Sequence, residues 1–272
     1  MGACVPSPVR TFQQRAADID WYCELRGAGP DIVLIPSGEG DCASFTRVAE
    51  LLADEFRVLT FDMPGFSRSG PPPDFAAITA DDVAAQIAAL LRALRIDSAT
   101  VYGCSSGGLF ALALAATQSD LVRNVLVHEV AAPPDPAVPL EPASPFAALF
   151  SPDDTVVVKT CQFLYRNVMN ENPAAWDALG LDFHERLARN YVTWARRYVA
   201  APRLLRTFNR SELTRRPITW TVGTVERILA GNRKLADVAD LPIGFLPCRH
   251  FPQVSIPEQL AAHIRDAARA HL

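Results

Sequence analysis

The segment Gly103-Cys104-Ser105-Ser106-Gly107 carries the clearest chemical signal in the sequence. The apolar run before it, 99–102, predicts a β-strand, and the run after it, 108–117, has the pattern of a helix. A Gly-x-Ser-x-Gly segment between a strand and a helix is typical of a nucleophile elbow, whose glycines permit a strained turn that exposes the serine hydroxyl. The alternative is an ordinary turn of small residues. The flanking strand and helix favour Ser105 as a catalytic nucleophile.

A serine nucleophile needs an imidazole base, and the imidazole needs a carboxylate that orients it. Behind an elbow of this kind, the chain order is serine, acid, histidine. His250 follows the last predicted strand, in a loop that can place its ring beside the elbow. Alternatively, His250 is a loop histidine that only caps a helix. We expect His263 and His271 to lie at the surface of the terminal helix, and His184 in a helical insertion. We therefore predict His250 as the base.

Two glutamates satisfy the chain order for the acid. Glu129 directly follows His128 near a strand end, and because neighbouring strand residues point to opposite faces, at most one of these two side chains can serve the site. Glu226 follows a later strand, at the place where many enzymes of this architecture keep their acid. The alternative for each is a solvated loop carboxylate, which for Glu226 would pair with Arg227. The spacing alone leaves the choice open.

Acyl transfer also needs backbone N–H groups that point at the developing oxyanion. Ser106 follows the nucleophile at the start of a helix and offers one such donor. Gly38, in the loop 36–40 after the first predicted parallel strand, is the second candidate, its alternative being an ordinary glycine turn. Cys104 precedes the serine, and we expect it to face the core as a small apolar side chain rather than act as a nucleophile.

The candidate nucleophile, base, acid and oxyanion donors can meet only if a sheet brings the ends of their strands to one edge. Short apolar runs alternate with helical patterns, which predicts an α/β fold, a mostly parallel central sheet with helices on both faces. The predicted strands are 32–35, 56–61, 99–102, 125–127, 218–222 and 243–246, with an earlier hairpin that includes 19–25. Thr79 and Asp82 predict one helix start, and Ser255, Pro257 and Glu258 predict another.

Residues 133–213 interrupt this alternation and predict an inserted helical cap. The remainder, 1–132 and 214–272, forms the predicted α/β core. Six prolines in the stretch 131–145 predict a stiff hinge between the two.

Composition narrows the classes of partner. The 272 residues hold 26 Lys and Arg against 30 Asp and Glu, a net charge of -4 that argues against nucleic acid as a partner. The six cysteines have no zinc-ligand or disulfide spacing, so we expect free thiols, no metal and a cytoplasmic location. No apolar run is long enough to span a membrane, and the first residues predict neither a signal peptide nor myristoylation. A homodimer is compatible with the sequence, which does not fix the oligomeric state.

The sequence resembles the α/β-hydrolase superfamily and, within it, the zearalenone lactonases, which open a macrocyclic resorcylic ester. The resemblance covers nearly the whole chain, the cap included. The stretches that carry it are Phe61-Asp62-Met63-Pro64-Gly65 with Ser67-Arg68-Ser69, Val101 to Gly107, His128-Glu129, Ala175-Trp176 with Ala178, Asn190-Tyr191 with Trp194-Ala195-Arg196 and Tyr198, Trp220-Thr221-Val222-Gly223, and His250-Phe251-Pro252 with Val254-Ser255.

The resemblance implies a hydrolase of an apolar lactone or ester that needs no cofactor. It implies Ser105 as nucleophile, His250 as base and Glu129 as acid, with Gly38 and Ser106 as the oxyanion hole. It also implies substrate contacts, above all for Trp194 of the cap, together with Val168, Met169, Tyr198 and Phe251. The alternative for Trp194 is a packing contact between cap and sheet.

Two other functions stay open at this stage. A general carboxylesterase or carbon–carbon bond hydrolase of the same fold would keep Ser105 and His250 but could use Glu226. A non-catalytic receptor of hydrolase fold would bind an apolar ligand under the cap without turnover.

Overall fold

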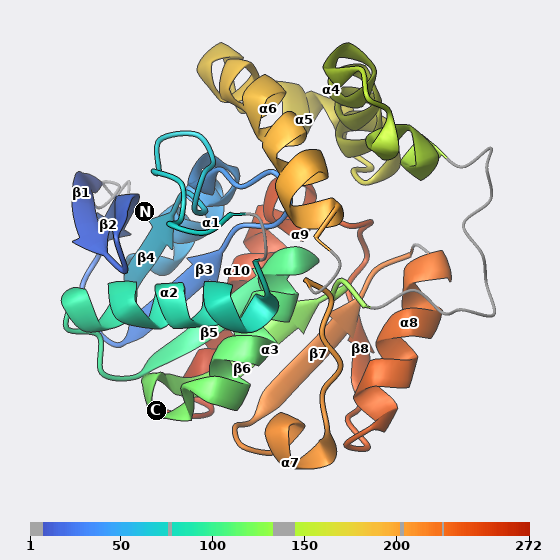
Figure 1. Ribbon diagram of the computed structural model, residues 1–272. Coiled ribbons are helices and arrows are strands. Elements are labelled where there is room, and N and C mark those ends of the chain that lie inside the picture. The colour runs from blue at the N-terminus through green and yellow to red at the C-terminus, as the bar shows by residue number, and fades with distance from the viewer. Residues whose placement is uncertain (1–7, 76–77, 133–144, 202–203, 225) are drawn as a thin grey trace, which may run out of the picture.

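The computed structural model describes residues 8–75, 78–132, 145–201, 204–224 and 226–272 (Figure 1). An eight-stranded sheet in the order β1-β2-β4-β3-β5-β6-β7-β8 forms its centre. The first two strands pair antiparallel, β2 joins β4 antiparallel, and all later neighbours are parallel. The strands are β1(Arg10–Ala16), β2(Ile19–Arg26), β3(Asp31–Ile35), β4(Arg57–Phe61), β5(Ala99–Cys104), β6(Val122–His128), β7(Ile218–Val222) and β8(Ile243–Phe245).

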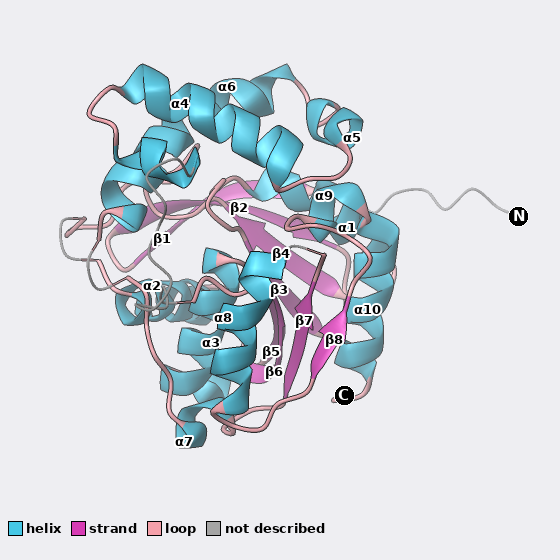
Figure 2. Ribbon diagram, turned by 90° about the vertical axis from the view of Figure 1, so that its right-hand side faces the viewer, coloured by secondary structure: helices cyan, strands magenta, loops and turns pink. Residues whose placement is uncertain are grey.

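Helices cover both faces of the sheet (Figure 2). On one face lie α2(Ala80–Ala93), α3(Ser106–Thr117) and α8(Glu226–Asp237), and on the other α1(Thr46–Leu52) and α10(Pro257–Arg269). Because both faces are covered, the central strands are continuously apolar; residues 32–35 of β3, for example, are all buried. The predicted α/β class is confirmed, and every predicted strand run overlaps a strand.

The two predicted helix starts differ in outcome. Thr79 and Asp82 form a capping box at the start of α2, as expected. The start of α10 is not capped by Ser255, so that prediction was wrong. Ser255 instead ends the short helix α9(Pro252–Ser255), where its hydroxyl donates to the Phe251 carbonyl at 3.1 Å. Ile256 precedes α10 without a side-chain cap, and Pro257 begins the helix as predicted.

A second group of helices lies above the sheet (Figure 2). It contains α4(Asp154–Phe163), α5(Pro173–Asp177) and α6(Leu181–Thr193), with the 3₁₀ segment η3(Pro145–Phe150) before them and the π-helical turns η4(Leu164–Val168) and η5(Trp194–Val199) that extend α4 and α6. We refer to residues 145–201 as the cap. Most of the expected proline hinge, residues 133–144, lies outside the described residues, and the domain boundaries remain predictions.

Three short helices complete the list of elements: η1(Cys42–Phe45), η2(Ser119–Leu121) and α7(Arg210–Leu213). Among the described helices, none has the length and apolar character that crossing a membrane requires.

The capping box of α2 allows a test of how firmly this helix is anchored. Thr79 accepts a hydrogen bond from the Asp82 backbone at 3.1 Å, and the Asp82 carboxylate accepts one from the Thr79 backbone at 2.9 Å. Thr79→Ala should lower the free energy of unfolding by about 1 kcal/mol, measured by urea denaturation. Thr117→Ala is the control, because its hydroxyl only donates to the Ala113 carbonyl inside α3. Equal effects of the two substitutions would contradict the prediction.

Candidate active site

Ser105 occupies a strained turn between β5 and α3. Its φ of 53° and ψ of -123° lie where a residue with a side chain is rarely found. The Ser105 N–H donates to the His128 carbonyl at 3.0 Å, and the Ser105 carbonyl accepts from the Ala131 N–H at 3.0 Å. These bonds from the strand β6 and the loop after it hold the turn, because strain persists only where the surroundings fix it.

The two glycines of the motif are required by close backbone contacts. A Cβ atom on Gly103 would collide with the backbone of Gly107. A Cβ on Gly107 would lie 2.5 Å from the Ile35 carbonyl oxygen and 2.8 Å from that of Pro36. The helix α3 can therefore start close beside the end of β3 only with glycine at both positions.

Glu129 and His250 meet at the carboxyl ends of the strands. His250 Nδ1 lies 2.6 Å from Glu129 Oε2, and the Gly223 N–H donates to Glu129 Oε1 at 2.8 Å. Glu129 itself follows β6 with a φ of 45°, and its side chain is buried. Both carboxylate oxygens are thus engaged, one by the loop after β7 and one by the loop after β8.

The surroundings of Glu129 favour its charged form. Burial by itself raises the pKa of Glu129, but the hydrogen bond with His250, the charge of that ring and the Gly223 N–H together lower the pKa below its ordinary value. A charged carboxylate at Nδ1 makes that nitrogen the donor, so the other nitrogen, Nε2, is the one free to accept a proton. The alternative acid, Glu226, begins α8, and its side chain lies outside the described part of the structure.

The loop that carries His250 is held at two further points. The His250 N–H donates to the Met169 carbonyl in the cap at 2.9 Å, and its carbonyl accepts from the Cys104 thiol at 2.9 Å. Cys104 is fully buried, and burial raises the pKa of its thiol well above the ordinary value, which agrees with the predicted core role. The His250 backbone is therefore held beside Cys104, the residue before Ser105.

The other histidines lie away from this pair or face other partners. His128 Nδ1 is 3.1 Å from Thr221 Oγ1, and its Nε2 is 3.2 Å from the Arg249 carbonyl. Burial lowers the pKa of His128 to about 4, so its ring is neutral near pH 7. His271 is exposed, as expected, but His263 is only partly exposed, and burial lowers its pKa. The prediction that His263 lies at the surface was wrong because the inner face of α10 packs on the sheet.

The predicted oxyanion loop lies against aromatic side chains of the cap. A Cβ atom on Gly38 would be 2.5 Å from the Tyr165 hydroxyl and 2.6 Å from Trp194 Nε1. Gly38 therefore has no room for a side chain. Ser106, the other predicted donor, is buried at the first position of α3, where helix N–H groups have no partner within the helix.

The residues predicted to contact substrate occupy different environments. Val168 is 38% exposed at the end of η4, and Met169 follows it, partly buried. Phe251 is buried and stacks on Tyr165 and Trp176 of the cap, with ring centroids 5.2 and 5.8 Å apart. Substrate contact by these three residues remains a prediction.

Tyr198, also predicted to contact substrate, lies in the core below the cap. Its hydroxyl donates to the Pro64 carbonyl at 3.0 Å, and its ring is surrounded by the rings of Phe66, Phe75 and Phe110. This environment explains how a residue at the end of η5 anchors the cap to the core. Its role toward substrate, like that of Trp194, stays a prediction.

Glu39 is a buried acid that the sequence reasoning passed over. It follows Gly38 and is fully buried; Ser44 Oγ donates to one carboxylate oxygen at 2.9 Å, and the other has no partner among the described atoms. Burial raises the pKa of Glu39 to about 7. Its signal in the sequence is an acidic residue in a short loop directly behind a wholly apolar strand.

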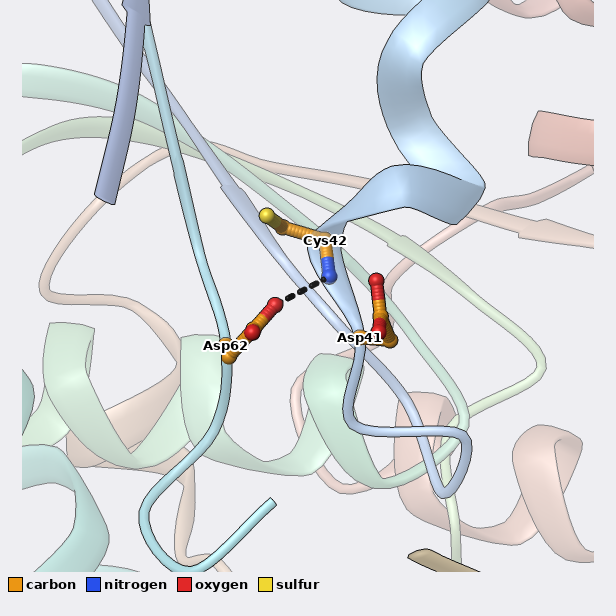
Figure 3. A group of neighbouring side chains, drawn as sticks. All are labelled: Asp41, Cys42 and Asp62. Carbon is orange, nitrogen blue, oxygen red and sulfur yellow. Dashed lines mark hydrogen bonds between the residues drawn. The ribbon is translucent and has the colours of Figure 1, made fainter. Parts of the chain in front are cut away.

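Asp41, Cys42 and Asp62 form a second acidic group beneath the same loop (Figure 3). Their ligand atoms lie within 4.8 Å of one another, close enough to share a cation. The carboxylates already have partners, however: Arg68 bonds Asp62 at 2.6 and 2.9 Å, and Arg186 of the cap bonds Asp41 at 2.6 Å. We interpret the group as a buried ion network, because guanidinium groups already bind both carboxylates.

The protonation of Glu39 predicts a pH effect on stability. Between the ordinary pKa of 4.5 and about 7, the folded protein keeps a proton that the unfolded chain has lost. The free energy of unfolding should therefore fall as pH rises through this window, by at most about 3 kcal/mol. Glu39→Gln, which stays neutral, should gain stability relative to wild type when urea denaturation at pH 8 is compared with pH 5.

The exposed Glu185→Gln on α6 is the matched control and should follow the wild-type pH dependence. A stability difference between Glu39→Gln and wild type that is the same at both pH values would contradict a protonated Glu39.

Comparison with known proteins agrees with the family inferred from the motifs. Residues 30–158 match the family of the alpha/beta hydrolase fold. The chain is 38% identical to a zearalenone hydrolase of Bionectria ochroleuca, over 93% of this chain and 96% of that protein. It is also 38% identical to a zearalenone hydrolase of Cladophialophora bantiana, over 98% of this chain and 99% of that protein.

Solved structures agree on the fold. An esterase from Thermogutta terrifontis superposes with a TM-score of 0.72 at 20% identity and covers 97% of this chain and 100% of its own. At that identity the likeness establishes the fold alone. The full-length identity to the two fungal proteins goes further: the chain belongs to the zearalenone hydrolase family of the α/β hydrolases and is a hydrolase.

Proposed function

We propose that this protein hydrolyses the ester bond of a macrocyclic resorcylic lactone such as zearalenone, through an acyl-enzyme on Ser105. His250 is the base, Glu129 is the acid that orients it, and the N–H groups of Gly38 and Ser106 form the oxyanion hole. The observation that carries the proposal is the 2.6 Å hydrogen bond between Glu129 and His250 beside the strained Ser105 turn. The zearalenone hydrolases that share 38% identity with the whole chain support the substrate class.

The first half of the reaction forms the acyl-enzyme. His250 Nε2 takes the hydroxyl proton as Ser105 Oγ attacks the lactone carbonyl carbon, and the carbonyl oxygen gains the negative charge. The Gly38 and Ser106 N–H groups stabilise that charge. The intermediate then breaks the bond to the ring oxygen, which takes the proton from His250 and leaves as a hydroxyl group, still attached to the opened macrocycle.

The second half of the reaction returns the free enzyme. His250 takes a proton from water, whose oxygen attacks the Ser105 ester carbonyl. The bond to Ser105 Oγ then breaks, the serine regains its proton from His250, and a carboxylic acid is released. The sum is one lactone and one water converted to one hydroxy acid. Glu129 keeps Nδ1 as a donor throughout and stabilises the imidazolium, a role that fits its lowered pKa.

The cellular setting belongs to the same proposal. We place the enzyme in the cytoplasm, because the five cysteines that the structure describes are all free and buried. A homodimer is compatible with this proposal, which does not fix the oligomeric state.

The role of Ser105 has a direct test. Ser105→Ala should reduce zearalenone hydrolysis by ~10⁴-fold or more, because the nucleophile itself is lost. Chromatography with mass detection measures the loss of the ring-closed compound. Ser151→Ala, in the loop between η3 and α4, is the control and should leave the rate unchanged. Undiminished hydrolysis by the Ser105 variant would refute the mechanism.

The choice of acid is tested separately. Glu129→Ala should lower kcat by roughly 10⁴-fold, because His250 loses the group that orients it, whereas Glu226→Ala should leave kcat near wild type. Steady-state kinetics with zearalenone and a p-nitrophenyl ester provide the readout. The opposite ranking of the two variants would assign the acid to Glu226 and favour the alternative of a general carboxylesterase or carbon–carbon bond hydrolase.

A further inference from the structure

We propose that Asn190, on the cap helix α6, is a positioning residue that holds the oxyanion loop 36–42 in its catalytic geometry. The inference rests on the proposed function and adds a residue to it. Asn190 belongs to an Asn-Tyr pair in the cap to which the reaction steps assign no role. Its side chain links three segments that are far apart in the sequence.

The Asn190 amide is buried, and both of its polar atoms are hydrogen-bonded. Its Nδ2 donates to the Glu39 carbonyl at 2.7 Å and to Ser67 Oγ at 2.7 Å, and its Oδ1 accepts from the Ser67 N–H at 2.8 Å. Such a fully used buried amide defines one position of the groups around it, because any movement leaves a polar atom without a partner.

The bond to Glu39 bears directly on the oxyanion donor. Glu39 follows Gly38, so fixing the Glu39 carbonyl limits rotation of the peptide planes around Gly38, whose N–H is the proposed donor. The rest of the loop is held by backbone bonds, from Gly40 to the Ser37 carbonyl at 3.0 Å and from Met63 to the Gly40 carbonyl at 2.9 Å. Asn190 is the contact through which a cap side chain holds this loop by its backbone.

Neighbouring cap residues act on the same loop. Trp194 lies four positions after Asn190 and thus on the same side of the helix, where its indole nitrogen faces Gly38. Arg186 lies four positions before Asn190 and binds Asp41 at 2.6 Å. Ser67 completes the link, since its hydroxyl donates to Asp41 at 2.7 Å. One stripe of the cap helix therefore contacts the oxyanion loop at both ends and in the middle.

A merely structural role would predict something different. An asparagine that only fastens the cap would, when removed, loosen substrate binding and lower thermal stability. A positioning residue for the oxyanion loop should instead affect the transition state more than the bound substrate. The two roles therefore differ in how a substitution divides its effect between kcat and KM.

The test compares Asn190→Ala and Asn190→Asp with wild type. Both variants should lower kcat for zearalenone by ~10- to 100-fold, less than the ~10²–10³ caused by deleting an oxyanion donor, with little change in KM. The Asp variant keeps the acceptor for the Ser67 N–H but turns both donations into contacts between a carboxylate and an oxygen. Its kcat relative to wild type should rise as pH falls, because a protonated carboxyl donates again.

Two binding measurements separate the bound substrate from the transition state. Phenylboronic acid forms a tetrahedral adduct with the serine, and its inhibition constant should rise in step with the loss in kcat. Zearalenone binding to Ser105→Ala should be unchanged when Asn190→Ala is added. Asp177→Asn is the control: it breaks the exposed ion pair with Arg166 at 2.6 Å, both partners of which belong to the cap, and should keep the wild-type kcat.

The inference fails if Asn190→Ala keeps the wild-type kcat, or if the inhibition constant of phenylboronic acid does not change. If the Ala variant does not fold, as judged by circular dichroism, the nearly isosteric Asp variant carries the same test. Failure of the proposed function has a different signature, since it would be seen as turnover by Ser105→Ala whatever the Asn190 variants do.

Discussion

The hydrogen bond between Glu129 and His250 joins residues that are 121 positions apart and depends on the order of the strands. Glu129 follows β6, its second partner Gly223 follows β7, and His250 lies in the loop after β8, which are three adjacent parallel strands. A buried carboxylate without these partners would be costly. The register of the sheet and the pairing of Glu129 therefore support each other. The backbone of Gly223 must also pass close to the Cys248 carbonyl, where a Cβ atom would collide.

The cap adds a second constraint, which is partly aromatic and partly polar. Tyr165 and Trp176 stack on Phe251, the residue after His250, while Asn190 and Arg186 bond the loop of Gly38. The aromatic contacts bury apolar surface between cap and core without fixing one orientation of the cap. The hydrogen bonds and the ion pair, in contrast, are satisfied in only one arrangement of the cap on the loop. The proposed site thus lies between the sheet edge and a cap that contacts both the residue after the proposed base and the proposed oxyanion loop.

The sequence predicted features that depend on residues close together along the chain, and it failed where the contacts join distant segments. The Ser105 turn, the strands and the capping box of Thr79 and Asp82 depend on neighbours within a few residues, and the structure has each of them. The acid could not be chosen by spacing, because Glu129 and Glu226 both follow strands and only tertiary contacts distinguish them. Ser255 failed as a cap for a similar reason: its hydroxyl found the Phe251 carbonyl in a separate short helix. The sequence presented Asn190 only as part of a family stretch, since its partners Glu39 and Ser67 come from distant segments. Glu39 was passed over because its raised pKa depends on its burial in the folded protein.

The charges beneath the oxyanion loop are balanced one by one. The loop and the end of β4 contribute three buried acids, and an uncompensated negative charge there would oppose the oxyanion that the loop is proposed to stabilise. Arg68 neutralises Asp62, and Arg186 neutralises Asp41. Glu39 is fully buried, and burial raises its pKa to about 7 against the opposing effect of the His250 charge, so it keeps a proton below that pH. The loop can therefore carry acids that anchor it to the cap and core, because two arginines and a proton remove the charge that would otherwise counteract its N–H donors.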